Sequence, residues 1–342
     1  MIRQDCLKSL TSSLGTLENL RDSHILITGG TGFIGKWLSE MLYILNEELH
    51  LNTHIYILAR NEPNNFSYKE NNNFHFIKSD IRNLKEIPKS INYIIHASGS
   101  PDSRDHISNP IKTLDTFYKG TQNILDQASR LPYLKKIIHL SSSKVYPNNY
   151  KMQPVSEENE LSSVFQNNDI YAESKRISET ICKAYISEFH LPIVITRPFA
   201  FMGPFQSLDK PWAINNFIRD AILGGPIRIL GNQQTTKSYL YGSDLAAILL
   251  NLLILGESGE VYNIGNTSPI ALIDLANKVK NSINSSIEIT IKSSKNQYSN
   301  TLFDVPDCSK VEKTLGLNPV YSFDEALRRT IAWNIMNSQD NG

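Results

Sequence analysis

The chain has few cysteines, no excess of either charge and no long apolar run. Its 342 residues include three cysteines, which are scattered along the chain as Cys6, Cys182 and Cys308. Cysteines in this arrangement indicate neither a disulfide framework nor a zinc site, so we expect no metal. The 34 basic and 34 acidic residues cancel to a formal net charge of zero. This balance leaves no excess of basic residues that would indicate binding to nucleic acid or to a membrane surface.

Targeting and membrane-spanning patterns are missing as well. The longest apolar run covers residues 245–250 and stops at Asn251, which makes it too short to cross a bilayer. The first 22 residues carry six charged side chains and lack an apolar core of the length that a secretory signal needs. We therefore expect a soluble, cytoplasmic protein that binds neither a membrane nor nucleic acid.

Strand and helix patterns alternate through the first 198 residues. Short apolar runs typical of buried parallel strands occupy residues 24–28, 54–58, 74–77, 93–96, 136–140 and 192–196. Helical patterns lie between them, near residues 33–45, 111–129 and 170–189. This alternation predicts an α/β fold of the Rossmann type, with a doubly wound parallel sheet built from βαβ units.

A glycine-rich turn follows the first predicted strand. Gly29, Gly32 and Gly35 are three residues apart and lie where the strand gives way to a helix. Such a turn lets the backbone approach a pyrophosphate, and the free N–H groups at the helix N-terminus favour an anion. Because the glycines stand between a strand and a helix, a dinucleotide-binding loop is favoured over a purely structural turn.

The end of the second predicted strand indicates which dinucleotide is bound. An acidic residue there would bond the ribose 2′-OH of NAD, whereas an arginine accommodates the 2′-phosphate of NADP. The chain has Arg60 at this point and no acid, so we expect NADP to be preferred and NAD to be possible. The alternative is that Arg60 is a solvated loop residue and NAD binds without the acid.

A Tyr-x-x-x-Lys pair and a serine run supply a candidate proton-transfer site. Tyr171 and Lys175 are one helical turn apart and therefore share a helix face. We expect the lysine ammonium to lower the pKa of the phenol, so that the tyrosine can act as acid or base near neutral pH. Ser142, from the run 141–143 at the end of the fifth predicted strand, is best placed to bond the substrate oxygen.

Beyond residue 198 the pattern becomes mixed. Helices are predicted at residues 212–223, 243–255, 272–280 and 323–334, with short strands at 227–230, 261–264 and 287–291. We read three parts: an N-terminal extension (1–22), a dinucleotide-binding domain with the catalytic helix (23–198), and a smaller mixed α/β substrate-binding lobe (199–342). The boundary between the last two is soft, since no linker marks it.

These motifs, in this order, resemble those of extended short-chain dehydrogenases/reductases, in the group of NAD-dependent epimerases/dehydratases that act on nucleotide sugars. The resemblance spans roughly residues 24 to 280. It is carried by the stretches 27–35, 78–82, 96–98, 141–146, 171–175, 197–204, 237–244 and 261–265.

The resemblance implies roles for individual residues. The cofactor would be held by Gly29, Thr31, Gly32, Phe33, Ile34, Gly35, Arg60, Asp80, Ile81, Ala97, Ser98, Gly99, Tyr171 and Lys175. Tyr171 would be the acid/base, Lys175 would hold the nicotinamide ribose, and Ser142 would bond the reacting oxygen of the sugar. Ser143, Asn216 and Lys237 would bind a nucleotide-diphosphate sugar. Helices near 111–129 and 170–189 would form a homodimer interface.

Several positions depart from the commonest pattern of the family. The 4,6-dehydratases carry Asp-Glu directly after the catalytic Ser/Thr, where this chain has Ser143 and Lys144. Neither can supply the acid and base for elimination, and a decarboxylase would normally keep a glutamate at Lys144. Ala200 replaces a substrate-binding asparagine. Lys237 replaces an arginine that pairs with the substrate phosphate, which keeps the charge but loses the bidentate fork.

Three functions are left open by this pattern. The first is hydride transfer at a sugar carbon, most often C4, by an epimerase or by a 4-ketoreductase. The second is a 4,6-dehydratase that uses atypical acid/base groups. The third is a non-catalytic dinucleotide-binding regulator, which the presence of Ser142, Tyr171 and Lys175 disfavours.

Overall fold

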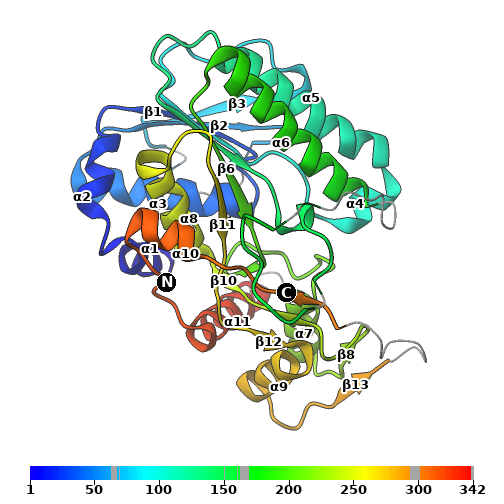
Figure 1. Cartoon of the computed structure of the whole chain (residues 1–342). Coiled ribbons are helices and arrows are strands. Elements are labelled where there is room, and N and C mark those ends of the chain that lie inside the picture. The colour runs from blue at the N-terminus through cyan, green and yellow to red at the C-terminus, as the bar shows by residue number, and fades with distance from the viewer. Residues whose placement is uncertain are drawn as a thin grey trace.

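The computed structural model describes residues 1–62, 68, 70–149, 151–159, 161, 169–292 and 301–339. Its centre is a seven-stranded, fully parallel sheet in the order β11-β6-β5-β4-β1-β2-β3 (Figure 1). The strands are β1 (His24–Thr28), β2 (His54–Ala59), β3 (Phe74–Lys78), β4 (Tyr93–His96), β5 (Lys136–Leu140), β6 (Ile193–Pro198) and β11 (Val261–Ile264). The prediction of a doubly wound parallel sheet is thus confirmed.

Helices cover both faces of this sheet. One face carries α3 (Phe33–Leu49) and α8 (Gly242–Leu255), and the other carries α5 (Pro110–Ala128) and α6 (Ile170–Phe189) (Figure 1). Successive strand residues enter opposite cores, as the two-residue period of a strand requires. Ile25 and Ile27 join the core under α3 and α8, whereas Leu26 joins the core under α5 and α6. Because both faces are covered, the strands read as continuous apolar runs.

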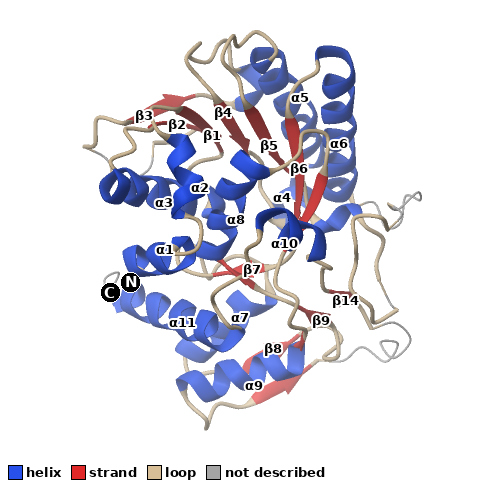
Figure 2. Cartoon of the chain, turned by 60° about the vertical axis from the view of Figure 1, so that its left-hand side comes forward, coloured by secondary structure: helices blue, strands red, loops and turns tan. Residues whose placement is uncertain are grey.

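A smaller lobe lies below the sheet in Figures 1 and 2. Its helices are α7 (Ala213–Ile222), α9 (Leu272–Ile283) and α11 (Phe323–Gln339). Short strand pairs and one three-stranded sheet complete it: β7 (Phe201–Met202), β8 (Ile227–Ile229), β9 (Thr236–Lys237), β10 (Leu240–Tyr241), β12 (Ile270–Ala271), β13 (Ile289–Ile291) and β14 (Phe303–Asp304). The predicted mixed α/β lobe is therefore present.

The smaller lobe was expected to comprise residues 199–342. The chain nevertheless returns from this lobe to the main sheet after residue 198. The strand β11 pairs in parallel with β6 at the edge of the main sheet, and α8 packs against α3. The short helix α10 (Ser309–Leu315) then packs on α8 and β11. The reason lies in α8, whose residues 242–253 are all buried, since a helix that is apolar all round needs neighbours on every side.

The N-terminal segment is part of the core rather than an appendage. The helices α1 (Ile2–Leu10) and α2 (Leu14–Leu17) bury Cys6, Leu10 and Leu17 completely. Asp5 is also fully buried and accepts a hydrogen bond from the Tyr241 hydroxyl at 2.6 Å. Arg329 of α11 forms an ion pair with the same carboxylate. The two ends of the chain are therefore tied together through Asp5.

Among the described residues, three short 3₁₀-helices connect other elements: η1 (Glu18–Leu20), η2 (Ile81–Asn83) and η3 (Ser143–Val145). Within the described ranges, no helix has the length and apolar character needed to cross a membrane.

Candidate active site

The glycine turn has the close approaches that its sequence predicted. Gly29 has a φ of +70°, and a Cβ there would lie 2.7 Å from the Ala97 carbonyl oxygen. At Gly35, in the first turn of α3, a Cβ would lie 2.4 Å from the Gly30 Cα. A side chain at either position would push apart the β1 turn, the end of β4 or the start of α3. The turn therefore keeps its backbone exposed to the space in front of the α3 N-terminus.

This space is a cleft of about 510 Å³ at the carboxyl ends of β1, β2 and β4. Ten of the residues predicted to bind the cofactor line it: Gly29, Thr31, Gly32, Phe33, Arg60, Asp80, Ile81, Ala97, Ser98 and Gly99. Ile34 and Gly35 do not, because Ile34 packs against the core and Gly35 against Gly30. The backbone cradle, the helix N-terminus and the size of the cleft all fit a dinucleotide.

Arg60 and Asp80 lie at the β2 and β3 end of the cleft. Asp80 accepts from the Arg82 guanidinium at 2.7 Å and 2.9 Å, and this pairing lowers the pKa of Asp80 to about 2. Arg60 is exposed and adds a smaller electrostatic effect in the same direction. A guanidinium group thus stands at the end of the second strand, where the sequence placed it.

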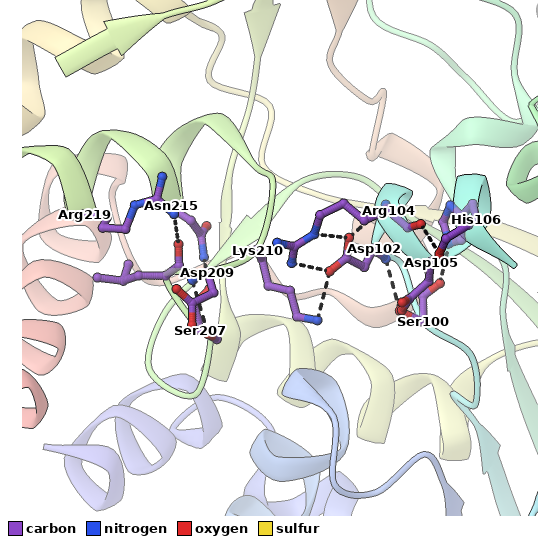
Figure 3. Close-up of polar contacts among 12 residues, drawn as sticks. Ser100, Asp102, Arg104, Asp105, His106, Ser207, Asp209, Lys210, Asn215 and Arg219 are labelled. Carbon is purple, nitrogen blue, oxygen red and sulfur yellow. Dashed lines mark hydrogen bonds and ion pairs between the residues drawn. The ribbon is translucent and has the colours of Figure 1, made fainter. Parts of the chain in front are cut away.

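The rest of the cleft lining includes two segments that sequence analysis did not single out. One is the short helix α4 (Ser103–Ser108) with the turn before it, and the other is the loop that leads to α7. Lys210 of that loop reaches across to Asp102, with 3.2 Å between its Nζ and a carboxylate oxygen (Figure 3). Asp102 also accepts from Arg104, and these partners hold its pKa below the usual range. An ion pair therefore joins the two domains beside the cleft.

Ser142, Tyr171 and Lys175 are brought together as predicted. Ser142 follows β5, and its hydroxyl is near enough to the phenol of Tyr171, at the start of α6, to lower the pKa of that phenol. Lys175 is 6 % exposed and donates from Nζ to the Leu140 carbonyl oxygen at 2.6 Å. None of the three lines the dinucleotide cleft itself. They lie at the same edge of the sheet, where the parallel strands β4 and β5 end.

The expected lowering of the Tyr171 pKa is not found. Burial raises the pKa of Tyr171 to about 12, and the hydrogen bond with Ser142 opposes this rise without reversing it. The Lys175 ammonium is 5.8 Å from the Tyr171 ring centre and is held closer to the Phe117 ring, at 4.4 Å. Burial lowers the pKa of Lys175 to about 7, against the opposing effect of Glu179. Desolvation therefore outweighs the attraction that the sequence argument had assumed.

Aromatic side chains enclose Tyr171. The His106 ring of α4 stacks on it with 4.5 Å between ring centres and 6° between the planes. The Phe117 ring of α5 packs edge-on against the Tyr171 ring, with 5.5 Å between the ring centres. His106 is fixed in turn by a 2.7 Å hydrogen bond between its Nε2 and the Ser100 carbonyl oxygen (Figure 3). Neither side chain could be identified from sequence, because α4 and α5 are distant from Tyr171 along the chain.

The predicted substrate residues have unequal surroundings. Asn216 is half-buried on α7, and its side-chain oxygen accepts from Arg219 at 3.0 Å. Lys237 forms an ion pair with Asp304, with 2.9 Å between Nζ and a carboxylate oxygen. Lys144 and Ser143 are close enough to Asp304 to help to lower the pKa of its carboxylate. We call Ser143, Lys144, Lys237 and Asp304 the Lys–Asp cluster. Asp304 was missed because only the pairing of β14 with β9 places it opposite Lys237.

Comparison with known proteins agrees with this architecture. The model of the NAD dependent epimerase/dehydratase family matches residues 25–265. UDP-glucuronic acid decarboxylase 3 of Arabidopsis thaliana is 30% identical over 304 residues, which cover 89% of this chain and 86% of that protein. UDP-glucuronic acid decarboxylase 1 of Xenopus tropicalis is 28% identical over 309 residues, covering 90% and 71%.

Solved structures share the fold over nearly the whole chain. An epimerase of Methanothermobacter thermautotrophicus superposes with a TM-score of 0.83 at 22% identity, covering 96% of this chain and 97% of that one. The dTDP-glucose 4,6-dehydratase of Bacillus anthracis, in complex with NAD, has a TM-score of 0.76 at 22% identity and coverages of 93% and 98%. With a family model that matches well over half of its length, this chain belongs to the NAD-dependent epimerase/dehydratase family.

Proposed function

We propose that this protein is a nucleotide-sugar oxidoreductase that transfers a hydride at a sugar carbon, with C4 the expected position. The observation that carries the proposal is that the Ser142 hydroxyl acts on the Tyr171 phenol, whose pKa it lowers, with Lys175 one turn further along α6. A bound nicotinamide would accept and return the hydride. A reacting carbinol needs a partner for its proton at the same moment, and Tyr171 is the group placed to take it.

Each side chain has a distinct task in this scheme. Ser142 accepts a hydrogen bond from the Lys144 backbone N–H at 3.2 Å, so its own hydroxyl proton is available to Tyr171 or to the sugar oxygen. Lys175, whose Nζ lies 5.8 Å from the centre of the Tyr171 ring, would hold the nicotinamide ribose. When Lys175 is protonated, its positive charge favours the phenolate form of Tyr171 and so acts against the effect of burial. Proton transfer thus runs from the sugar hydroxyl to Tyr171, with Ser142 holding the oxygen in line.

An epimerase and a 4-ketoreductase both use this machinery. An epimerase oxidises the sugar carbon and returns the hydride to the other face, so its cofactor stays bound. A ketoreductase consumes NADPH and must release the cofactor. Arg60 beside the cleft supports NADP, and this favours the reductase, whereas the NAD dependence of the family favours the epimerase. A dehydratase is the weaker alternative, because Ser143 and Lys144 supply no acid/base carboxylate.

We further propose a homodimer through α5 and α6. These two helices lie side by side over one face of the sheet (Figure 1), with α4 next to them. Large apolar side chains are exposed on all three: Ile107 is 81% exposed, Ile111 71%, Tyr118 41% and Ile177 37%. Ile111 and Tyr118 are seven residues apart and therefore share one face of α5. Covering this face with a second copy would remove apolar surface from water.

A panel of UDP- and dTDP-linked sugars, tested with added NAD or NADPH, checks the proposed activity. Turnover of at least one sugar nucleotide is expected in the wild type. Tyr171→Phe should still bind the dinucleotide but should lose turnover. If the wild type binds the dinucleotide and turns over no sugar nucleotide or 4-keto sugar, the protein is a binding protein and the proposal fails.

A further inference from the structure

The Tyr171 ring depends for its support on elements outside its own helix. Tyr171 is the second residue of α6, which begins at Ile170. Side chains of a helix point toward its N-terminus and lie over the preceding turn. A residue in the first turn has no preceding turn beneath it, so the orientation of the Tyr171 ring must be set by other elements.

Two rings from other helices supply this support. Phe117 of α5 packs edge-on against the Tyr171 ring and is 3% exposed. His106 of α4 covers one face of the Tyr171 ring, with 4.5 Å between the ring centres and 6° between the planes. His106 is half-buried, so it is the contact nearer to solvent. Removing the imidazole would therefore open one face of the phenol ring.

The imidazole of His106 is itself held in one orientation. A hydrogen bond of 2.7 Å joins its Nε2 to the Ser100 carbonyl oxygen (Figure 3). A carbonyl oxygen can only accept, so Nε2 carries a proton and donates it. Ser100 is fixed in turn, because its hydroxyl donates to the Asp105 carboxylate at 2.6 Å. The orientation of the imidazole is thus set by its own segment of chain and is independent of Tyr171.

The helix that carries His106 has little else to hold it. All of residues 103–108 are exposed except His106. Asp102, directly before them, is buried and caps the helix by accepting from the Arg104 backbone N–H at 3.0 Å. Its carboxylate also pairs with Lys210 of the loop that leads to α7, so the start of α4 is anchored (Figure 3). A helix that buries no apolar side chain gains little from packing, and the one side chain that α4 turns inward lies on Tyr171.

The position of the phenolic oxygen is what this contact controls. That oxygen is the Tyr171 atom farthest from the backbone, so a small rotation about the Cα–Cβ bond moves it more than any other atom of the ring. Proton transfer needs about 2.6–3.2 Å between the phenolic oxygen and the sugar oxygen. A misplacement of about 1 Å can lower the rate by about 10²-fold.

We propose that His106 is a positioning residue for the proton transfer. By stacking on Tyr171, it holds the phenolic oxygen at the place where the sugar hydroxyl reacts. His106 does not line the dinucleotide cleft, so its effect passes through Tyr171 and not through the cofactor. This inference rests on the proposed function.

Substitutions that separate the ring from its hydrogen bond test the inference. His106→Ala removes both, His106→Gln keeps an N–H donor without a ring, and His106→Phe keeps a ring without the donor. The kcat should fall about 10²-fold in His106→Ala and His106→Gln and stay within about tenfold of the wild type in His106→Phe. The KM for the sugar nucleotide and the affinity for the dinucleotide should change less than about threefold, as expected for a group that acts on the reacting atoms alone. Ser103→Ala, at an exposed position of the same helix, is the control and should change none of these values.

A double-mutant cycle separates positioning from a general effect on the fold. If His106 acts through the Tyr171 hydroxyl, His106→Ala should change kcat less than about twofold when it is added to Tyr171→Phe. A purely structural role would lower kcat in both backgrounds. Urea denaturation checks that each variant is folded. If His106→Ala does not fold, His106→Gln and His106→Phe are compared in the two backgrounds instead.

Four outcomes would overturn the inference. They are an unchanged kcat in His106→Ala, an equal loss of kcat in both backgrounds, a His106→Gln variant as active as the wild type, and a His106→Phe variant as slow as His106→Ala. If the wild type turns over a sugar nucleotide and Tyr171→Phe does not, these outcomes remove only this inference. A wild type that binds the dinucleotide but turns over no sugar nucleotide or 4-keto sugar overturns the proposed function and this inference together.

Discussion

The dinucleotide cleft and the Lys–Asp cluster lie at the same end of the protein but are built in opposite ways. The glycine turn at the cleft is made by backbone from one short stretch, in which Gly29 and Gly35 permit close approaches of 2.7 Å and 2.4 Å. The cluster is made by side chains from three segments, and its central ion pair joins residues 67 positions apart. Local backbone geometry leaves a strong sequence signature. A cluster of side chains that are far apart in the sequence leaves almost none. The cleft could therefore be predicted from sequence, whereas the partners within the cluster could not.

The largest effect is expected at the proton-transfer pair, which lies between these two regions. Tyr171→Phe should lower kcat by about 10²–10⁴-fold, the usual size of a general acid–base contribution. Dinucleotide affinity should change little, since the phenol does not line the cleft. Steady-state kinetics and calorimetry would measure both, with Tyr133→Phe, at an exposed tyrosine in the loop before β5, as the matched control. A kcat within a few fold of the wild type would remove Tyr171 from the mechanism.

A side chain at the glycine turn should have the next largest effect. Gly35→Val would drive a branched side chain into Gly30 and should lower the free energy of unfolding by about 3 kcal/mol. Dinucleotide binding should be lost at the same time, because the α3 N-terminus moves. Gly231→Val is the control, as a Cβ at Gly231 meets nothing within 4 Å. Urea denaturation of the two variants would show the difference, and equal stability would contradict the close packing.

The stability of the protein should depend on pH through Lys175. Its pKa is lowered by burial from 10.5 to about 7. Between these values the unfolded chain binds a proton that the folded chain does not, so the free energy of unfolding should rise with pH. The rise amounts to about 2 kcal/mol between pH 7 and pH 9. It should be smaller in Lys175→Met, measured by urea denaturation at both pH values. Parallel profiles of the two proteins would show that Lys175 is charged in both states.

The smallest effect concerns the choice of dinucleotide. Arg60→Ala should weaken NADPH binding about tenfold, the value of one charge-assisted contact, and leave NADH unchanged. Fluorescence titration with both cofactors would measure this, with Arg130→Ala as a control at an exposed arginine away from the cleft. If both cofactors bind the wild type equally and Arg60→Ala alters neither, the preference for NADP is wrong and Arg60 is a solvated loop residue.

Most of the fold could be predicted from sequence because its signals are local. The strands β4 and β5 match their predicted bounds, since apolar runs buried on both faces end sharply at polar residues. The assignment of β11 and α8 to the smaller lobe was wrong, because their place in the main sheet depends on the order in which distant segments pair. The same limit explains why the Arg197–Glu179 ion pair, which is almost fully buried between β6 and α6, could not be foreseen.

The candidate site shows the same difference between features set by local sequence and features set by contacts between distant segments. The group of Ser142, Tyr171 and Lys175 followed from spacing on one helix and one strand end. Their ionisation did not, since the pKa of a group depends on burial by residues such as Phe117 and His106. Asp304, the partner of Lys237, likewise could not be predicted from sequence, because β14 pairs with β9 only in the folded chain. Sequence therefore located the reactive groups, and structure was needed to find their partners.

Transfer of a deuterium label from the sugar tests the central claim most directly. UDP-glucose and UDP-glucuronic acid, each carrying deuterium at C4, would be mixed with the protein and oxidised cofactor. The reaction would be quenched within the first turnover, before an epimerase returns the label to C4, and the nicotinamide would be analysed by mass spectrometry. Our account predicts that deuterium from at least one of these sugars appears in the nicotinamide, and that Tyr171→Phe slows its appearance by at least about 10²-fold. Deuterium that remains entirely on C4 in both sugars, with the cofactor bound, would contradict hydride transfer at that carbon.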